Sequence, residues 1–318
     1  MWLIRAWRTQ APWLILLAPL ALLNAALAWL NRKLQRHDAV KIAKRVIVVG
    51  NISLGGSGKT PFAGWLAQEL QQRGKKVAII SKGYGRRSSL PHPQRANADP
   101  ARFGDEPAML ASQLPQLSVW VCDNRLVAIK TVEADYLICD DGLQDYRFYP
   151  RIEIALLDAT LGPVGRKRFP WGVLREPVTR LDACDLVIQQ GGNTLVHPAC
   201  GSFELVIEGF TNLVDGSCKT LAQAQADWSN TELHLCCALA NNQRVFDQFD
   251  AMGFSTTKHA FPDHHSFIAK DILYQGQVLL TAKDAIKCAT FAQSNCWQID
   301  ARVHMSPELA GRIMRLVM

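Results

Sequence analysis

The chain has 318 residues, of which 48% are hydrophobic, and this is enough to bury the cores of two α/β lobes. Its net charge of +7 lies within residues 1–45, which hold eight basic residues and one acid, whereas the other 27 basic and 27 acidic residues cancel. This excludes the evenly basic face of a typical nucleic-acid binder, and a basic block beside an apolar run indicates an anionic membrane surface instead. The nine cysteines include no C-x-x-C pair and favour a reducing compartment over a disulfide framework.

An uncharged apolar run covers residues 11–30 and is followed by six basic residues between 32 and 45. Twenty residues correspond to about one bilayer span. Three interpretations compete: a cleaved signal peptide, a spanning helix that keeps the rest of the chain in the cytoplasm, and a helix lying in the membrane interface. In the third, tryptophans at 2, 7, 13 and 29 would sit at headgroup level. We expect membrane attachment, with its depth left open.

A phosphate-binding loop follows at residues 46–61, VIVVGNISLGGSGKTP. The β-branched run 46–49 predicts a buried parallel strand, and a helix is expected over 61–72. Between them, the backbone of Gly55, Gly56, Ser57 and Gly58 would cradle phosphates, Lys59 would reach the outer phosphates, and Thr60 would hold Mg²⁺. Ser53 stands where the full motif has glycine. The stretch predicts a nucleoside triphosphate site, so export by a signal peptide ranks last.

Further strand and helix patterns continue the same lobe. Strands are expected at 76–81, 119–122, 136–141, 152–158 and 185–189, and helices after residue 104 and over 123–133. The strand at 136–141 ends in Asp140 and Asp141, where an acid of a P-loop enzyme holds Mg²⁺. The patterns predict an α/β protein with a membrane-associated N-terminal helix (1–40), a P-loop core with a mostly parallel sheet (41–200), and a smaller α/β lobe (201–318) that closes over the active site.

Motifs along nearly the whole chain then point to one family. They are VGNISLGGSGKTP at 49–61, KGYGR at 82–86, GDEP at 104–107, DDGLQ at 140–144, LLDA at 156–159, LREP at 174–177, FPDHH at 261–265 and TAKDAIK at 281–287. In number and order they resemble the tetraacyldisaccharide 4′-kinases, the lipid A kinases of Gram-negative bacteria. The chain departs from the family pattern at Lys82, Asp145 and Ala282.

The resemblance implies an activity. It is the transfer of the γ-phosphoryl of ATP to the 4′-hydroxyl of an acylated glucosamine disaccharide 1-phosphate, giving lipid IVA, with Mg²⁺ present. It also implies a place on the inner membrane, peripheral or singly anchored, with the catalytic part facing the cytoplasm. We expect neither a nucleic acid nor an obligate protein partner.

The resemblance also implies roles for individual residues. Asp105 would be the base that accepts the hydroxyl proton, supported by His264, with His265 as the fallback. Lys59 would serve catalysis as well as phosphate binding, and Thr60, Asp140 and Asp141 would hold Mg²⁺. The lipid's sugar and 1-phosphate would be held by Arg125, Arg175 and Gln144, since the arginine fork suits anions.

Two other functions stay open on the residues alone. A membrane-associated P-loop switch is one, but Leu54 stands where partition ATPases carry a signature lysine, and the acid of 281–284 has the wrong spacing for a guanine-specific motif. Another small-molecule kinase is compatible with the P-loop by itself. The apolar N-terminus favours an acceptor carried by a lipid.

Overall fold

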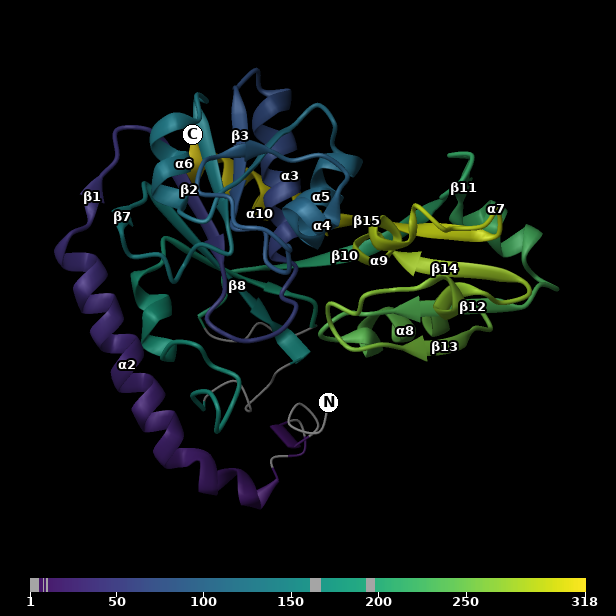
Figure 1. Cartoon of the computed structure of the whole chain (residues 1–318), viewed down its shortest axis with the longest axis horizontal. Helices are drawn as coiled ribbons and strands as arrows, with labels where there is room; N and C mark the ends of the chain where they lie inside the picture. The colour runs from purple at the N-terminus through teal and green to yellow at the C-terminus, as the bar shows by residue number, and fades with distance from the viewer. Residues whose placement is uncertain (1–5, 8, 10, 161–166, 193–197) are drawn as a thin grey trace.

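The computed structural model describes residues 6–7, 9, 11–160, 167–192 and 198–318. The described chain forms two lobes joined by long strands, with a helix along one flank (Figure 1). One sheet runs through both lobes in the order β13-β12-β14-β15-β10-β9-β8-β2-β6-β3-β5-β4. The predicted α/β class with a mostly parallel sheet is therefore confirmed.

The first lobe contains the predicted P-loop core. Its strands are β2 (Arg45–Gly50), β3 (Val77–Ser81), β4 (Gln94–Arg95), β5 (Ser118–Val121), β6 (Tyr136–Asp140), β8 (Ile152–Asp158) and β9 (Leu186–Gln190). All pair in parallel except β4, which lies antiparallel at the edge. In β2, Ile47 and Val49 face one core cluster while Val46 and Val48 face another. The strand is thus buried on both faces, as its β-branched run predicts.

Helices cover both faces of this sheet. One face carries α3 (Lys59–Gln72), α5 (Asp105–Gln113) and α10 (Pro307–Val317), whose side chains share one core cluster. The other carries α6 (Arg125–Thr131) and η3 (Val178–Ala183). Helix α3 begins two residues earlier than expected, at Lys59, because Gly58 takes the left-handed conformation that starts it. The short α4 (Pro100–Phe103) precedes α5.

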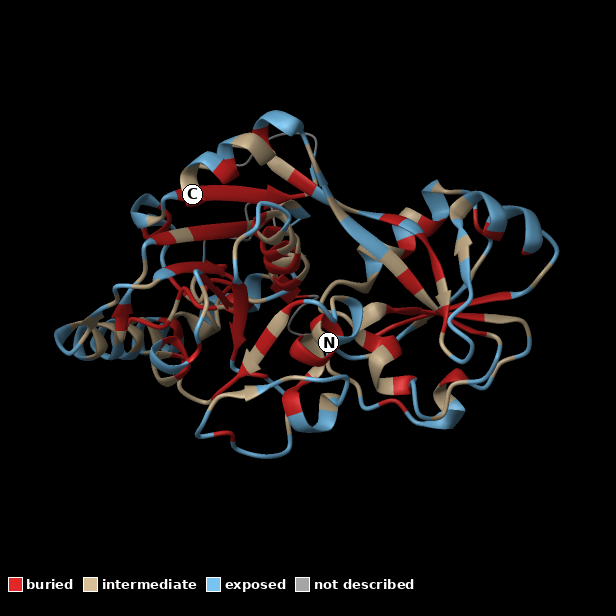
Figure 2. Ribbon diagram, turned by 90° about the horizontal axis from the view of Figure 1, so that it is seen from above, coloured by how far each residue is buried: buried red, intermediate tan, exposed pale blue. Residues whose placement is uncertain are grey.

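The second lobe is smaller and has its own core. Its strands are β10 (Ser202–Asn212), β11 (Cys218–Thr220), β12 (Leu233–Cys237), β13 (Thr257–Ala260), β14 (Gln277–Thr281) and β15 (Cys296–Met305). Its helices are α7 (Leu221–Asp227), α8 (Asn242–Ala251), η4 (Ala269–Ile272) and α9 (Ala282–Cys288). Two apolar clusters fill it, and Figure 2 shows the buried strands of both lobes in red.

Strands β10 and β15 connect the lobes. They pair antiparallel from Phe203 with Met305 to Asn212 with Trp297, with one irregularity near Gly209. After β15 the chain returns to the first lobe, where Leu309 and Ile313 of α10 pack into the P-loop core. The small lobe therefore lies between two segments of the first lobe, and a division of the chain at residue 200 stays a prediction.

The N-terminal segment lies outside both cores. It forms η1 (Pro12–Leu17) and α2 (Ala18–His37), and the chain then pairs β1 (Val40–Lys41) with β7 (Phe148–Tyr149). Within the helical stretch Pro12–His37, an 18-residue window has a mean hydropathy of 2.1, and the stretch is long and apolar enough to cross a membrane. Trp7, which the interpretation as an interfacial helix would place at headgroup level, is instead buried in the protein, and its indole N–H donates to the Pro170 carbonyl. Trp2 lies outside the described residues.

Candidate active site

The phosphate-binding loop connects β2 with α3 at the carboxyl edge of the sheet. Gly55 and Gly58 have φ angles of 114° and 70°, which residues with a side chain rarely adopt. A Cβ on Gly58 would also lie 3.1 Å from the ring of Phe203, so the loop is held closely against the start of β10. Beneath the loop, the buried amide of Asn51 donates to the Ser57 hydroxyl at 3.1 Å. The loop is thus shaped to present its backbone N–H groups to an anion.

Two carboxylates with different environments lie at the end of β6. Asp140 is 2% exposed, and its Oδ2 accepts a 2.8 Å hydrogen bond from the Thr60 hydroxyl. Burial, then the nearby charge of Glu106, raises the pKa of Asp140 above its ordinary value. Asp141 has a φ of 50° and lies 3.8 Å from Lys59 and 3.1 Å from Arg175. Burial opposes ionisation of Asp141, but these cations bring its pKa below the ordinary value.

The donor set beside the loop fits a magnesium ion. Oδ1 of Asp140 is buried and has no hydrogen-bond partner among the described residues. A buried carboxylate oxygen without a partner costs free energy unless a cation approaches it. Mg²⁺ prefers hard oxygen ligands such as this carboxylate and the Thr60 hydroxyl. These two predicted metal residues are brought together, whereas Asp141 is engaged with Lys59 and Arg175.

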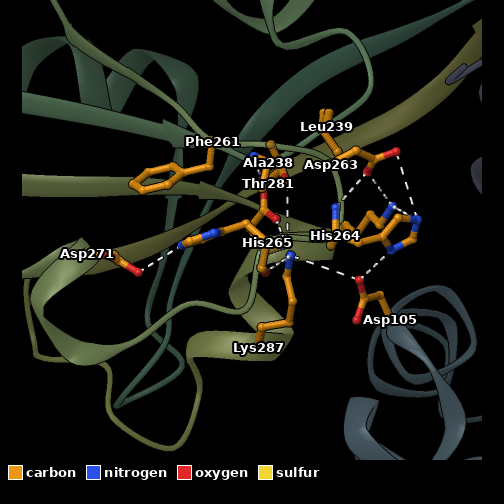
Figure 3. A network of polar contacts seen from close by, with 12 residues as sticks. Asp105, Ala238, Leu239, Phe261, Asp263, His264, His265, Asp271, Thr281 and Lys287 are labelled. Atoms are coloured by element: carbon orange, nitrogen blue, oxygen red, sulfur yellow. Dashed lines mark hydrogen bonds and ion pairs between the residues drawn. The ribbon is translucent and has the colours of Figure 1, made fainter. Parts of the chain in front are cut away.

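A carboxylate–imidazole pair joins the two lobes. Asp105 begins α5 directly after Gly104, and its Oδ2 lies 3.1 Å from Nδ1 of His264 (Figure 3). His264 comes from the turn after β13, with a φ of 59° that is uncommon outside glycine. Lys283 lies 3.5 Å from the other ring nitrogen of His264. Burial alone would raise the pKa of Asp105, but the hydrogen bond from His264 and the charge of Lys287 bring this pKa below its ordinary value.

Two glycines fix the backbone of the loops beside the Asp105–His264 pair. Gly83 and Gly104 have φ angles of 64° and 90°. A Cβ on Gly83 would lie 2.2 Å from the Phe103 carbonyl, and one on Gly104 would lie 2.6 Å from the Tyr84 carbonyl. The KGYGR and GDEP motifs are therefore two loops in direct backbone contact. Tyr84 then places its ring 5.3 Å from the ring of His264.

The fallback residue His265 has a different environment. Its Nε2 lies 2.9 Å from Asp271, and its ring stacks on Phe261 with the ring centres 4.7 Å apart. Both partners belong to the small lobe. The structure thus brings His264, and not His265, to Asp105.

The three residues predicted to bind the lipid lie around the end of β6. Arg125 is 4% exposed and donates to the carbonyls of Asp140 and Asp141 at 2.6 and 2.9 Å. Gln144 donates to the Asn51 carbonyl and to a carboxylate of the LREP motif. Arg175 contacts Asp141. All three line the cleft between the lobes, and their role in lipid binding stays a prediction.

The site also contains residues that the sequence interpretation missed. Arg244 of α8 donates to the Gly56 carbonyl at 3.3 Å and to Asp158 and Gln190, which places a small-lobe cation on the phosphate-binding loop. Lys283 and Lys287 of α9 reach the start of α5. A signal for these lysines was available, because they are four residues apart in TAKDAIK and so share one face of a helix.

Comparison with known proteins identifies the family of the chain. The model of the tetraacyldisaccharide-1-P 4′-kinase family, LpxK, matches residues 13–318. The chain belongs to this family. The tetraacyldisaccharide 4′-kinase of Azoarcus sp. (strain BH72) is 39% identical over 97% of this chain and 93% of its own length. That of Dechloromonas aromatica (strain RCB) is 38% identical over 98% and 96%.

A solved structure of the family has the same fold. LpxK from Aquifex aeolicus, crystallised in complex with ATP, matches 96% of this chain and 99% of its own with a TM-score of 0.75 at 24% identity. The expected family, fold class and enzyme class, an ATP-dependent kinase of lipid A biosynthesis, are confirmed. The reaction of the site is therefore that of the tetraacyldisaccharide 4′-kinase family.

Proposed function

We propose that this tetraacyldisaccharide 4′-kinase uses the Asp105–His264 pair to accept the proton of the 4′-hydroxyl while the γ-phosphoryl of ATP is transferred to that oxygen. The observation that carries the proposal is the 3.1 Å contact between a carboxylate of one lobe and an imidazole of the other. His264 lines the same cleft as the phosphate-binding loop. A sugar hydroxyl needs such an acceptor because it is a poor nucleophile while it keeps its proton.

The phosphate-binding loop binds and orients the phosphates of ATP before the transfer. The backbone N–H groups of residues 55–60 and the Lys59 ammonium hold the β- and γ-phosphates. Thr60 and Asp140 would hold Mg²⁺, which supplies positive charge against the phosphates when bound. Asp141 orients Lys59 through the 3.8 Å ion pair between them.

The transfer step balances without any further reactant. The 4′-oxygen forms a bond to the γ-phosphorus, and the bond from that phosphorus to the β,γ-bridging oxygen breaks, so its electron pair leaves with ADP. The hydroxyl proton passes to the Asp105–His264 pair and later to water. The low pKa of Asp105 keeps its carboxylate ionised and ready at neutral pH.

Within the pair, either group could touch the hydroxyl. Asp105 is the base in the arrangement that the family resemblance implies. The exposure of the two side chains favours a second arrangement, since His264 keeps 30% of its side chain exposed and Asp105 only 13%. The imidazole would then take the proton at Nε2, and Asp105 would orient it through Nδ1.

We propose that the lipid is held beside this pair. Arg175 reaches the cleft with 32% of its side chain exposed, and its fork suits the 1-phosphate. Arg125 is nearly buried, so it supports the site by fixing the carbonyls of Asp140 and Asp141. Gln144 lines the same cleft from the adjoining turn and would contact the sugar. These assignments rest on their position around the cleft.

The N-terminal helix would bring the enzyme to its substrate at the inner membrane, peripherally or as a single anchor with the catalytic lobes in the cytoplasm. Of the α2 residues, Ala21 alone is buried in the structure. Its large exposed apolar side chains are Leu20, Leu22, Leu23, Leu27, Trp29, Leu30 and Leu34. Burying such a row in lipid is favourable, and Arg32, Lys33 and Arg36 beside it suit anionic headgroups.

A transfer assay tests the proposed reaction. The detergent-solubilised protein is incubated with Mg²⁺, γ-labelled ATP and tetraacyldisaccharide 1-phosphate, and the lipid is examined for label. We expect label at the 4′ position, and its loss in Asp105→Asn. Full turnover in Asp105→Asn would contradict the assignment of the pair, and ATP hydrolysis without lipid labelling would contradict the transfer.

A further inference from the structure

Lys287 is an inward-pointing lysine of the small lobe at the boundary with the other lobe. Its side chain is 9% exposed. The ammonium lies 2.8 Å from Oδ1 of Asp284, donates to the His265 carbonyl at 3.1 Å, and lies 4.0 Å from Oδ2 of Asp105. Figure 3 shows it pointing from α9 towards Asp105 and the histidine turn. A lysine is rarely so enclosed unless its ammonium is paired with an opposite charge.

The small lobe holds this ammonium in place. Asp284 is fully buried, and its Oδ2 accepts hydrogen bonds from the Ala238 amide at 2.9 Å and the Thr281 hydroxyl at 2.7 Å. Its Oδ1 approaches Lys287 as an ion pair outside hydrogen-bonding geometry, so the N–H bonds of Lys287 remain available for other acceptors. The ring of Phe267 lies 5.0 Å from the ammonium. The position of the charge is therefore fixed by the lobe and not by Asp105.

Two lysine–carboxylate pairs join α9 of the small lobe to α5 of the first lobe. Helix α9 presents Lys283 one turn before Lys287, and α5 presents Asp105 and Glu106 at its start. Lys287 lies 4.0 Å from Asp105, and Lys283 lies 3.9 Å from Glu106. Two cations on one helix face thus meet two neighbouring carboxylates across the boundary. An isolated surface pair would contribute little, but both lysines here are mostly enclosed.

We propose that Lys287, anchored by Asp284, is a positioning residue that fixes the ionised Asp105 against His264 when the lobes are together. This inference rests on the proposed role of the Asp105–His264 pair. His264 and Lys287 approach the same oxygen of Asp105, so the two contacts fix the orientation of the carboxylate. The Asp284 carboxylate pairs with the Lys287 ammonium on the side away from Asp105. This ion pair offsets the cost of enclosing the ammonium, so that Lys287 does not need a substrate to compensate its charge.

The charge also sets the protonation of the pair. The groups that face Asp105 are His264, Lys283 and Lys287 from the small lobe and Glu106 from its own helix, with Asp263 and Asp284 behind them. Lys287 and Lys283 both lower the pKa of Asp105. Removing Lys287 therefore raises the apparent pKa of the pair, and the acid limb of the pH–rate profile moves to higher pH.

The test compares kcat, KM for ATP and the pH–rate profile of the full chain with those of three variants. Lys287→Met is expected to lower kcat at neutral pH on the order of 10-fold, leave KM for ATP within about twofold, and move the acid limb to higher pH. Lys287→Arg retains the charge and is expected to keep the acid limb in place. Lys270→Met is the control, because Lys270 is an exposed lysine of the same lobe, and it should match the parent.

A fourth variant separates positioning from folding. Lys287→Met leaves Asp284 buried without its partner and should lower the melting temperature. Lys287→Met with Asp284→Asn removes both charges, so it should recover much of the melting temperature while the acid limb stays shifted. If the profile returned to that of the parent together with stability, Lys287 would be structural only and the proposal would be overturned. An unmoved acid limb in Lys287→Met would overturn it as well.

Asp105→Asn distinguishes the failure of this inference from the failure of the proposed pair. If Lys287 acts through Asp105, adding Lys287→Met to an Asp105→Asn background has no further effect on the residual kcat. An additional 10-fold loss in that background would show that Lys287 acts elsewhere. Full activity of Asp105→Asn alone would instead refute the pair itself.

Discussion

The hydroxyl of Thr60 donates a 2.8 Å hydrogen bond to Oδ2 of Asp140, which joins the start of α3 to the end of β6. This bond occupies one oxygen of the carboxylate and leaves Oδ1 buried and without a hydrogen-bond partner in the described part of the chain. Burial makes ionisation of Asp140 costly as long as no cation is present. The first prediction follows from this arrangement.

Magnesium binding should depend on pH. The pKa of Asp140 is raised, so below it a proton competes with the cation and Mg²⁺ binding weakens as pH falls. Without a cation the raised pKa favours the folded state at low pH, and this contribution is lost as pH rises through it. Mg²⁺ should therefore raise the melting temperature more at pH 8 than at pH 5.5, as measured by thermal unfolding. Asp140→Asn should lose that difference, whereas Asp99→Asn, an exposed helix cap, should keep it.

Lys59→Ala and Asp105→Ala should both abolish turnover, for different reasons. Lys59 contacts phosphates, so its loss should weaken ATP binding substantially, whereas Asp105 lies at the lobe boundary and should leave ATP affinity nearly unchanged. Equilibrium binding of a labelled ATP analogue measures both. An equal loss of affinity in the two variants would contradict the assignment of Asp105 to proton transfer.

His264→Ala should lower kcat on the order of 10²-fold with little change in KM for ATP, as expected for loss of acid–base help. His265→Ala offers a matched control, since the neighbouring imidazole bonds Asp271 inside the small lobe. We expect that variant to lose stability more than turnover. Steady-state kinetics at saturating lipid measures both, and an unchanged kcat in His264→Ala would remove it from the mechanism.

The backbone contact between the KGYGR and GDEP loops should be sensitive to a single methyl group. Gly83→Ala places a Cβ 2.2 Å from the Phe103 carbonyl at a φ of 64°, and we expect a loss of more than about 2 kcal/mol of stability. Gly74→Ala is the control, because Gly74 has a φ of 73° with open space around its Cβ position. Its cost should be about 1 kcal/mol. Urea unfolding measures the difference, and equal losses would show that the close contact is unimportant.

Membrane attachment should depend on the exposed face of α2. Leu23→Glu with Leu27→Glu should reduce co-sedimentation with anionic vesicles, since each change places a charge in the apolar row. Leu273→Glu alters an equally exposed leucine of the small lobe and should bind vesicles like the parent. Unchanged sedimentation of the α2 variant would contradict attachment through this face.

Local patterns predicted much of the fold and part of the site. The run at 46–49, the glycine loop and the strand ending at Asp140 lie where they were expected, because strand period and glycine conformation are local properties. The choice of His264 over His265 depended on family resemblance, since neighbouring histidines look alike in a sequence. It is the left-handed φ of His264 that turns its ring towards Asp105.

Contacts between distant segments were not predictable in this way. Lys287 reaches Asp105 across 182 positions because α9 and α5 meet at the lobe boundary, and Arg244 reaches Gly56 from α8 in the same manner. The burial of Trp7 depended on the loop that carries Pro170, which no local pattern places beside the N-terminus. Side chains that join separately folded lobes carry no periodic signal of their own.

The return of α10 to the first lobe has a consequence for biosynthesis. Leu309, Ile313, Met314 and Val317 fill the same core as β2 and α3, yet they follow the whole small lobe in chain order. The small lobe has all of its strands earlier, so it can fold while the P-loop lobe still lacks one wall. The nucleotide-binding half of this kinase therefore becomes complete only after the whole small lobe has been synthesised, and deletion of α10 would keep the phosphate loop but remove part of the core that shapes it.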